Sequence, residues 1–534
     1  MKILSTLLLC LLLLPAHAAK VETGDADLDK VFQALIGKDF VAKENALKQL
    51  AASGHAQRFE MIEGVMDGRL RVHKESKRLV WAERQGRRYL ATDVLNGEVL
   101  GDFKKRRLKK ISINNQLRRV INAIIATRDL DSEDPALRLK SVQAMLADPS
   151  PEQVGVIEPR LQQENDAQVR SAMQLVLALA NLGADDAAIR LRAVEGVSGS
   201  LEPAVRQQLD GMAESDPDPA VKKAAAAALI KIEDRVRIFG HIETLFFGLS
   251  LGSVLVLAAI GLAITFGVMG VINMAHGELI MLGAYTTYLI QQLMPESAGL
   301  SLLLSIPAAF MVSGLVGIGI ERGVIRFLYG RPLETLLATF GISLILQQLV
   351  RTLISPQNVP VSNPEFMSGF WQVNSVLSLT YNRMYIILFC LLVFAGLFLI
   401  LKRTRLGLQV RAVSQNRAMA RAMGVHSARV DALTFGLGSG IAGVAGVALS
   451  QLTNVGPNLG QAYIVDSFMV VVFGGVGNLW GTLIGGIGLG VANKFMEPWA
   501  GAVMAKILIL VLVILFIQKR PRGLFPQKGR AAEG

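Results

Sequence analysis

Three residues with hydrogen-bonding side chains, Asn273, His276 and Glu278, lie within six positions of an otherwise apolar stretch. Ionisable and amide side chains at membrane depth cost free energy, so they usually face a partner or a water-filled path. Glycines flank the cluster, which favours a broken helix whose polar groups face a translocation path, as in transporters with discontinuous helices. The alternative interpretation is a short solvated turn between two membrane helices on the cytoplasmic side.

A second group of polar residues lies between residues 453 and 467, close to several glycines. Asp466 opens an apolar run, where a carboxylate is costly unless it faces a cavity or a partner. The alternative is that part of this group forms only a tight turn that caps the next helix. The candidate residues of a substrate path in this second group are Asn454, Asn458, Tyr463 and Asp466.

The third distinctive stretch is a basic connector, residues 402–430, with seven Lys and Arg residues and no carboxylate. Short loops rich in Lys and Arg resist translocation, so we expect this connector in the cytoplasm. Its middle, Val410 to Met423, is rich in Ala and lacks Gly and Pro, which predicts a short helix at the membrane surface that ends at Gly424. The connector is therefore a candidate docking surface for a cytoplasmic protein.

The elements that must position these residues are apolar segments, and the mean hydropathy of +0.42 is too high for an ordinary soluble protein. We expect nine segments, at 244–270, 276–293, 299–320, 333–354, 384–401, 431–451, 464–476, 479–493 and 500–517. An exported front and a basic cytoplasmic tail, residues 519–534, require an odd number of crossings. A re-entrant hairpin in the Gly-rich stretch 473–490 would lower the number to seven.

The N-terminus predicts a secretory signal peptide, residues 1–18, because Lys2, an apolar core and a small-x-small cleavage site follow one another. The alternative is an uncleaved membrane helix, but the apolar core falls short of the roughly 20 residues that a span needs. The signal peptide predicts that the segment 19–240 is exported. The transmembrane permease-type domain then occupies 241–518.

The exported segment has the pattern of short amphipathic helices. Three stretches that begin at Asp134, Asn165 and Asp216 each place an Asp or Asn cap before an apolar-basic pair and an Ala-rich face. This resembles a degenerate helical-hairpin repeat of the HEAT type, and the alternative is an unrelated helical bundle. Residues 78–103 alternate between apolar and polar and contain Asn96-Gly97, which predicts a small β insertion. The expected fold class is thus an all-α polytopic membrane protein with an exported HEAT-like front domain.

Several classes of function are disfavoured by the sequence. It has no GxxxxGK[ST] phosphate loop, no HExxH motif, no Cys-His cluster and no nucleophile elbow. The basic charge lies in loops between apolar segments without interleaved stacking aromatics, which argues against nucleic-acid binding. We therefore expect no enzyme, no cofactor and no metal site in this chain.

Three motifs carry a resemblance to a known family: GVMGVINMAHGELIMLGAY, the connector sequence QNRAMARAMGV and the closing RPRGLFP. They resemble the permease subunits of the branched-chain amino-acid and amide type of ABC importer. Residues 453–482 are similar to the urea-type permease, in which a long exported front domain also occurs. Such permeases often carry a Glu-Ala-Ala type sequence in the connector, whereas here Ala418 and Met419 occupy the first two positions and Gly424 is present.

The resemblance implies an ATP-driven urea importer in the bacterial cytoplasmic membrane, with branched-chain amino acids or short amides as the alternative cargo. It implies four kinds of partner: a second homologous permease, two cytoplasmic ATPase subunits, an extracytoplasmic substrate-binding protein and the lipid bilayer. The implied ATPase-coupling residues are Arg411, Asn416, Arg417, Arg421 and Gly424. A hypothesis from another class makes the chain a membrane-anchored scaffold or sensor whose exported domain is the working part.

Overall fold

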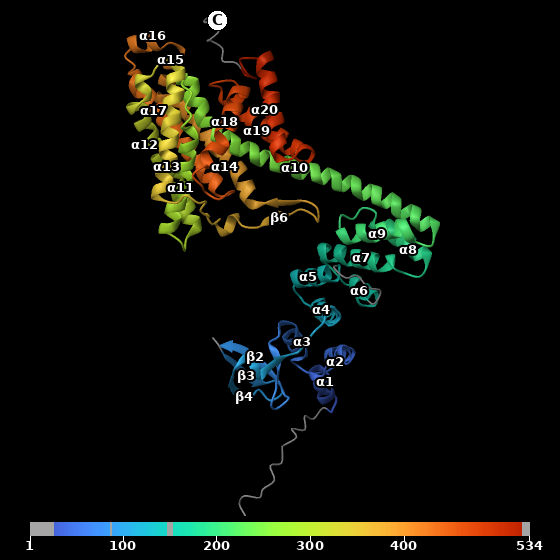
Figure 1. The fold of residues 1–534 in the computed structure, drawn as a ribbon. Coiled ribbons are helices and arrows are strands. Elements are labelled where there is room, and N and C mark those ends of the chain that lie inside the picture. The colour runs from blue at the N-terminus through green and yellow to red at the C-terminus, as the bar shows by residue number, and fades with distance from the viewer. Residues whose placement is uncertain (1–25, 86–87, 147–152, 526–534) are drawn as a thin grey trace, which may run out of the picture. The chain divides into compact units, whose positions relative to one another are not determined.

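The computed structural model describes residues 26–85, 88–146 and 153–525 (Figure 1). The expected signal peptide and residues 526–534 of the expected tail lie outside the described residues. The chain divides into two compact units, residues 1–232 and 233–534, and each is described by itself.

The first unit begins with three helices, α1 (Ala26–Ile36), α2 (Phe40–Ala52) and α3 (Arg58–Asp67), and a small sheet. The strands are β1 (Leu70–His73), β2 (Leu79–Gln85), β3 (Arg88–Asp93), β4 (Val99–Phe103) and β5 (Leu108–Lys110). They pair antiparallel in the order β4-β3-β2-β1-β5. The β insertion expected over 78–103 covers β2 to β4, and β1 and β5 extend the sheet on either side.

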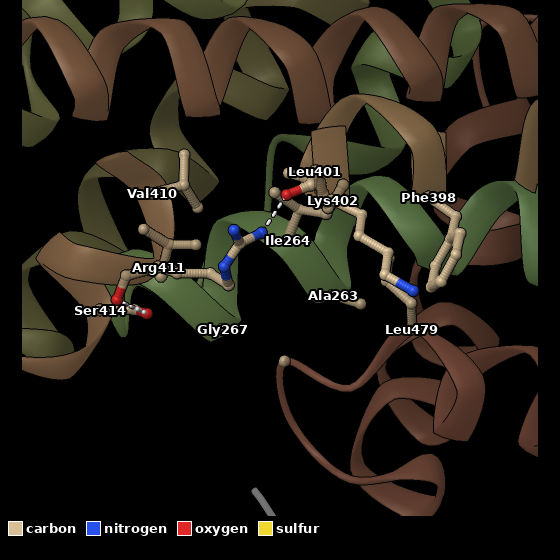
Figure 2. A pocket seen from close by; sticks show the side chains of 12 residues that line it. Ala263, Ile264, Gly267, Phe398, Leu401, Lys402, Val410, Arg411, Ser414 and Leu479 are labelled. Carbon is tan, nitrogen blue, oxygen red and sulfur yellow. Dashed lines mark hydrogen bonds between the residues drawn. The ribbon is translucent and has the colours of Figure 1, made fainter. Parts of the chain in front are cut away.

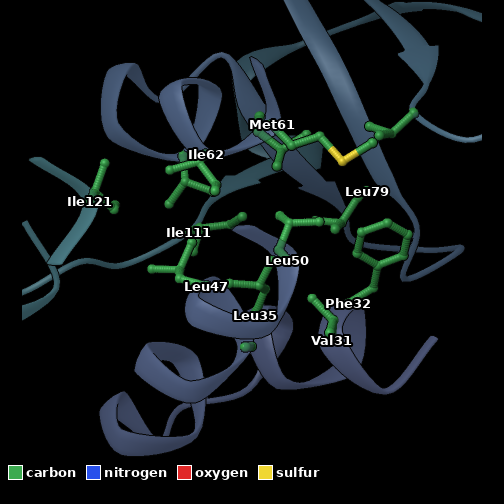
Figure 3. Packing of buried hydrophobic residues seen from close by; sticks show 14 of the residues in the cluster. Val31, Phe32, Leu35, Leu47, Leu50, Met61, Ile62, Leu79, Ile111 and Ile121 are labelled. Atoms are coloured by element: carbon green, nitrogen blue, oxygen red, sulfur yellow. The ribbon is translucent and has the colours of Figure 1, made fainter. Parts of the chain in front are cut away.

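A hydrophobic core joins these helices to the sheet (Figure 3). Leu50, Met61 and Ile62 have no exposed surface, and Leu47 is 1% exposed. Burial of such side chains contributes about 1.5–3 kcal/mol each, so this cluster holds the front of the unit together.

The rest of the first unit is helical: α4 (Asn115–Asp129), α5 (Pro135–Leu146), α6 (Val154–Leu161), α7 (Ala167–Leu182), α8 (Ala187–Val197), α9 (Pro203–Ser215) and the start of α10 (Pro219–Met269). Two arginines make the same set of contacts 52 residues apart. Arg138 binds both carboxylate oxygens of Glu164 at 2.8 Å, and Arg190 binds those of Asp216 at 2.9 Å. Each arginine also donates to the carbonyls five and six residues before it. In each case a largely buried ion pair joins two residues that lie 26 positions apart in the sequence.

The second unit contains the end of α10 and the helices α11 (His276–Leu293), α12 (Ala298–Gly323), α13 (Pro332–Leu353), α14 (Tyr381–Arg403), α15 (Arg405–Gln415), α16 (Arg417–Ala422), α17 (Ser427–Ser450), α18 (Leu459–Gly474), α19 (Leu479–Ala500) and α20 (Ala502–Lys519). A two-stranded hairpin, β6 (Phe370–Gln372) and β7 (Ser378–Thr380), precedes α14. Each of the nine expected apolar segments coincides with one of these helices.

Six helices in the described part of the chain are long and apolar enough to cross a membrane. They are α10, α12 with its 3₁₀ extension to Phe327, α13, α14, α17 and α20. The other three expected segments, α11, α18 and α19, do not reach that criterion, and α18 is a shorter apolar helix. The Gly-rich stretch 473–490 forms the end of α18 and the start of α19, which meet closely at Gly474 and Gly481.

Helix α17 is almost completely buried and packs against α11 and α12. Glycines let the backbones approach closely there. A Cβ atom built on Gly283 of α11 would lie 2.0 Å from the carbonyl oxygen of Gly443 in α17. A Cβ atom on Gly446 of α17 would lie equally close, at 2.0 Å, to the carbonyl oxygen of Ile280 in α11. Small residues at such contacts are typical of helices packed within membranes.

Candidate functional site

A short non-helical stretch, residues 270–275, separates two helices, as both interpretations of the sequence require. Helix α10 ends at Met269, Gly270 adopts a φ of +67°, and α11 begins at His276. The intervening backbone is held by side chains: Asn273 Oδ1 accepts a hydrogen bond from Ala275 N at 3.0 Å, and Thr339 Oγ1 accepts one from Met274 N at 3.1 Å. The left-handed φ at Gly270 is favoured by glycine, which explains why the helix can turn here.

His276 and Asn273 are completely buried beside this break. The Nε2 atom of His276 donates to the carbonyl oxygen of Ala258, a residue inside α10, at 2.8 Å. Within the described residues, His276 Nδ1 and Asn273 Nδ2 have no hydrogen-bond partner. Buried polar atoms are normally satisfied, so these two atoms are exceptions among the described residues.

Glu278 is 1% exposed and is held by helix α13. Its Oε1 atom accepts hydrogen bonds from Ser343 Oγ at 3.0 Å and from Gln347 Nε2 at 2.7 Å. Its Oε2 atom is buried and unpartnered in the part of the chain that the structure describes. The site therefore presents one carboxylate oxygen fixed by neutral donors and one oxygen free to accept.

Helix α13 also supplies residues to this site, although the sequence pattern predicted none from this helix. Four buried polar residues recur every four positions along this helix: Thr335, Thr339, Ser343 and Gln347. Residues four apart share one face of a helix, so this spacing within an apolar segment could have predicted a polar face on α13. It shows that a polar stripe on α13 faces the helix break.

The residues predicted between 453 and 467 have separate partners. Asn458 Oδ1 accepts a hydrogen bond from Arg351 Nη2 at 2.7 Å, and Arg351 follows Gln347 by one turn on α13. Asp466 of α18 pairs with Lys506 of α20 at 3.3 Å. Asn454 is exposed in the loop before α18, and Tyr463 is half-buried. His276 is thus held against α10 and Glu278 against α13, and Asn458 bonds a residue one turn beyond Gln347, whereas Asp466 pairs with α20.

The basic connector forms two short helices, α15 and α16, where the sequence predicts one helix. Asn416 separates them: it ends α15 and caps α16, with its Oδ1 accepting from Met419 N at 2.9 Å. The connector chain turns at Gly424, whose φ is +84°. The buried face of the connector, Val410, Val413 and Ala420, packs with Val430 of α17.

The basic side chains predicted to couple to an ATPase are engaged within the chain. Arg417 donates through both terminal nitrogens to Asp431 of α17, at 2.7 and 3.0 Å, and its guanidinium lies 4.6 Å from the ring centre of Tyr329. Arg421 Nε donates to Ser427 Oγ at 2.8 Å, and Arg411 donates to the carbonyl oxygen of Leu401. Apolar side chains are also exposed here: Met419 of α16 is 61% exposed, and Met423, directly after the helix, is 78% exposed.

Electrostatics strengthen the Arg417 pair. Burial lowers the pKa of Arg417, but the hydrogen bonds and charge of Asp431 outweigh it, and the pKa is raised overall. Burial, with the charge of Asp431, also raises the pKa of Tyr329, which therefore remains a neutral hydroxyl. A bidentate, charge-assisted contact of this kind is stronger than a neutral hydrogen bond, and it also holds the two side chains in one relative orientation.

A pocket of about 270 Å³ lies under the connector, between α10, α14 and α15 (Figure 2). Its walls include Ile264 and Gly267 from α10, Lys402 from the end of α14, and Arg411 and Ser414 from α15. Among the residues that the structure describes, no group of three or more metal-binding side chains comes together.

Comparison with known proteins identifies the class of this second unit. Residues 244–517 match the family described as branched-chain amino acid transport system, permease component. The chain therefore belongs to this family of transport permeases.

Curated relatives agree with this assignment. The chain is 32% identical to the high-affinity branched-chain amino acid transport system permease protein BraD of Pseudomonas aeruginosa, over 54% of this chain and 96% of that protein. It is 31% identical to the corresponding protein LivH of Salmonella typhimurium, over 53% of this chain and 94% of the relative. The ribose import permease protein RbsC of Escherichia coli is 24% identical, over 52% of this chain and 85% of its own length. Residues ahead of 244 lie outside the family match.

Proposed function

We propose that this chain is the membrane-spanning permease subunit of an ATP-driven importer for small molecules that carry N–H groups. The observation that supports this most is the buried Glu278 at the helix break, with one carboxylate oxygen fixed by Ser343 and Gln347 and the other unpartnered. A carboxylate oxygen and a neutral imidazole nitrogen accept hydrogen bonds, whereas the Asn273 amide nitrogen donates. Such a set suits an ammonium or amide group together with a carbonyl or carboxylate oxygen.

Branched-chain amino acids are the first candidate cargo, because the family and its curated relatives are described by that transport. An α-ammonium group would approach Glu278, and an apolar side chain would find the surrounding aliphatic helices. Urea is the second candidate. It is supported by the similarity of residues 453–482 to the urea-type permease and by the long front segment, which lies outside the family match.

We propose that ATP hydrolysis is supplied by two partner subunits that dock on the connector, residues 402–430. The exposed Met419 on α16 and Met423 directly after it give them an apolar contact surface. The other proposed partners are a second homologous permease, which completes the path, and an extracytoplasmic substrate-binding protein.

The proposed location is the bacterial cytoplasmic membrane, with nine crossings. The connector and the tail from residue 519 lie on the cytoplasmic side, because both are rich in Lys and Arg. The front segment, residues 19–240, is then extracytoplasmic after removal of the signal peptide.

The repeated contacts of Arg138 and Arg190 support a HEAT-like arrangement of the helices in this front segment, and such arrays often present a concave surface to proteins. We propose that this surface receives the substrate-binding protein.

Uptake of labelled leucine and labelled urea at low external concentration tests this proposal. A strain that lacks the chain is complemented with the wild type, with Glu278→Gln or with Glu334→Gln, an exposed glutamate at the start of α13 that pairs with Arg331. We expect the wild type to restore uptake of one cargo, Glu278→Gln to reduce it at least tenfold and Glu334→Gln to leave it unchanged. Failure of the wild type to restore uptake of either compound would refute the cargo assignment. Full activity of Glu278→Gln would refute the placement of the path.

A further inference from the structure

The way α16 is fastened to α17 distinguishes Arg417 from an ordinary surface arginine. Both terminal nitrogens of Arg417 are used on Asp431, whose side chain is 3% exposed. The Arg417 side chain itself is 29% exposed, and the ring of Tyr329 covers its guanidinium. An arginine held in this way has few N–H groups left to bind a docking protein.

The opposite side of α16 has the properties of a docking surface. Met419 and Met423 point their apolar side chains outward, at 61% and 78% exposure. Met419 of α16 therefore faces outward, whereas Arg417 faces inward to α17. A force applied to the outer side must pass through the inner contacts to reach the membrane helices.

Asp431 provides a direct route from α16 to the helix break. It lies near the start of α17, the buried central helix of the unit. Further along α17, Gly443 and Gly446 meet the backbone of α11 without intervening side chains. Helix α11 begins with His276 and carries Glu278. Close-packed helices transmit displacement because they have few voids to absorb it.

We propose that Arg417 is a positioning residue of the transport cycle, and that its bidentate contact with Asp431 makes α16 and α17 move as one body. This inference rests on the proposed function, since it assigns the connector to a docked ATPase. Arg421, which donates to Ser427, and Ala420, which packs with Val430, are further attachments between the same two helices. Loss of the Arg417 pair lets α16 follow the ATPase while α17 stays behind, so hydrolysis continues without transport.

The test uses the complete transporter, purified with its ATPase partners and reconstituted in liposomes with the binding protein. The variants are Arg417→Gln, Arg417→Lys, Asp431→Asn and the double variant Arg417→Gln/Asp431→Asn. Arg429→Gln is the matched control, because Arg429 is an exposed cation of the same connector. Three quantities are measured for each: recovery of the assembled complex, the rate of ATP hydrolysis, and labelled leucine or urea taken up per ATP hydrolysed.

We expect Arg417→Gln and Asp431→Asn to assemble, to hydrolyse ATP within twofold of the wild type and to lower uptake per ATP at least tenfold. Arg417→Lys should recover part of the uptake, because the lysine ammonium keeps the positive charge beside Asp431 but cannot make the bidentate contact of the guanidinium. The double variant should be no worse than either single variant, since both remove the same link. Arg429→Gln should match the wild type.

Three results would overturn the inference. Wild-type uptake per ATP in Arg417→Gln would show that the pair transmits nothing. A loss of ATP hydrolysis in parallel with uptake would make Arg417 a docking residue. Failure of Arg417→Gln, Arg417→Lys and Asp431→Asn to assemble would assign the pair to folding alone. A wild-type complex that hydrolyses ATP but moves neither cargo would refute the proposed function instead, so the two failures can be told apart.

Discussion

Replacement of Gly283 by alanine should destabilise the membrane unit and distort the polar site. A Cβ atom at this position would lie 2.0 Å from the carbonyl oxygen of Gly443, and 2.5 Å from its carbonyl carbon and Cα atom. Both partners are helix backbone, so no side chain can move aside. Relief of the clash requires α11 and α17 to separate by about 1 Å, and overpacking of this kind typically costs about 1–3 kcal/mol. The ratio of correctly packed to unfolded protein should therefore fall by roughly 5- to 150-fold.

Gly319→Ala is the matched control for this prediction, because nothing lies within 4 Å of the Cβ position of Gly319 on α12. The two variants are compared in detergent by the temperature at which half of the protein unfolds and by cargo uptake at a permissive temperature. Gly283→Ala should unfold at a lower temperature and transport less, whereas Gly319→Ala should behave like the wild type. Equal stability of the two variants, or a less stable Gly319→Ala, would refute the packing argument.

Three further predictions follow from other contacts. In the first unit, hydrogen bonds from arginine lower the pKa of Glu164 and of Asp216, so these carboxylates should stabilise the unit above about pH 4. That contribution is lost as pH falls through the lower folded-state pKa values, and Glu164→Gln should flatten the acid side of the stability profile measured by circular dichroism. Asn416→Ala removes the cap of α16 and should destabilise that helix by about 1 kcal/mol, seen as faster hydrogen exchange of its amides. Met423→Asp places a charge on the exposed apolar side of α16 and should weaken recovery of the ATPase with the purified chain.

Each of these predictions has its own control. Glu98→Gln tests a carboxylate on the exposed loop before β4, and an acid profile that changes equally in both variants would contradict the assignment to Glu164. Asn416→Asp keeps a side-chain acceptor at the cap, so it should retain slow exchange. Leu408→Asp adds a charge at an exposed apolar position of α15, and equal loss of the ATPase in this variant would place the docking surface over both helices.

Several features of the protein could be predicted from local sequence. Apolar length gave nine segments that coincide with helices, because a helix satisfies its own backbone hydrogen bonds wherever it is surrounded by apolar groups. The glycines and polar residues around Asn273 indicated the helix break, since Gly270 supplies a backbone conformation that other residues rarely adopt. The connector helix was also predicted, although Asn416 divides it in two because its side chain caps the second half.

The two arginine ion pairs of the first unit show where local patterns were insufficient. The sequence indicated apolar-basic pairs after Asp134, Asn165 and Asp216, but it did not indicate a role for Arg190. Its partner Asp216 lies 26 residues away, as Glu164 does from Arg138. The likeness of the two ion pairs is visible only in the structure, because the number of residues between an arginine and a carboxylate does not show whether the two side chains meet.

The sequence by itself determined which segments are apolar, where the positive charge gathers and which polar residues interrupt a membrane helix. The tertiary structure alone decided that Glu278 meets Ser343 and Gln347, which follow it by 65 and 69 residues. It also decided that Arg417 turns inward to Asp431 and not outward to a partner. Hydrophobicity and charge act on each segment separately, whereas a buried carboxylate or guanidinium can be satisfied only by groups that helix packing brings to it.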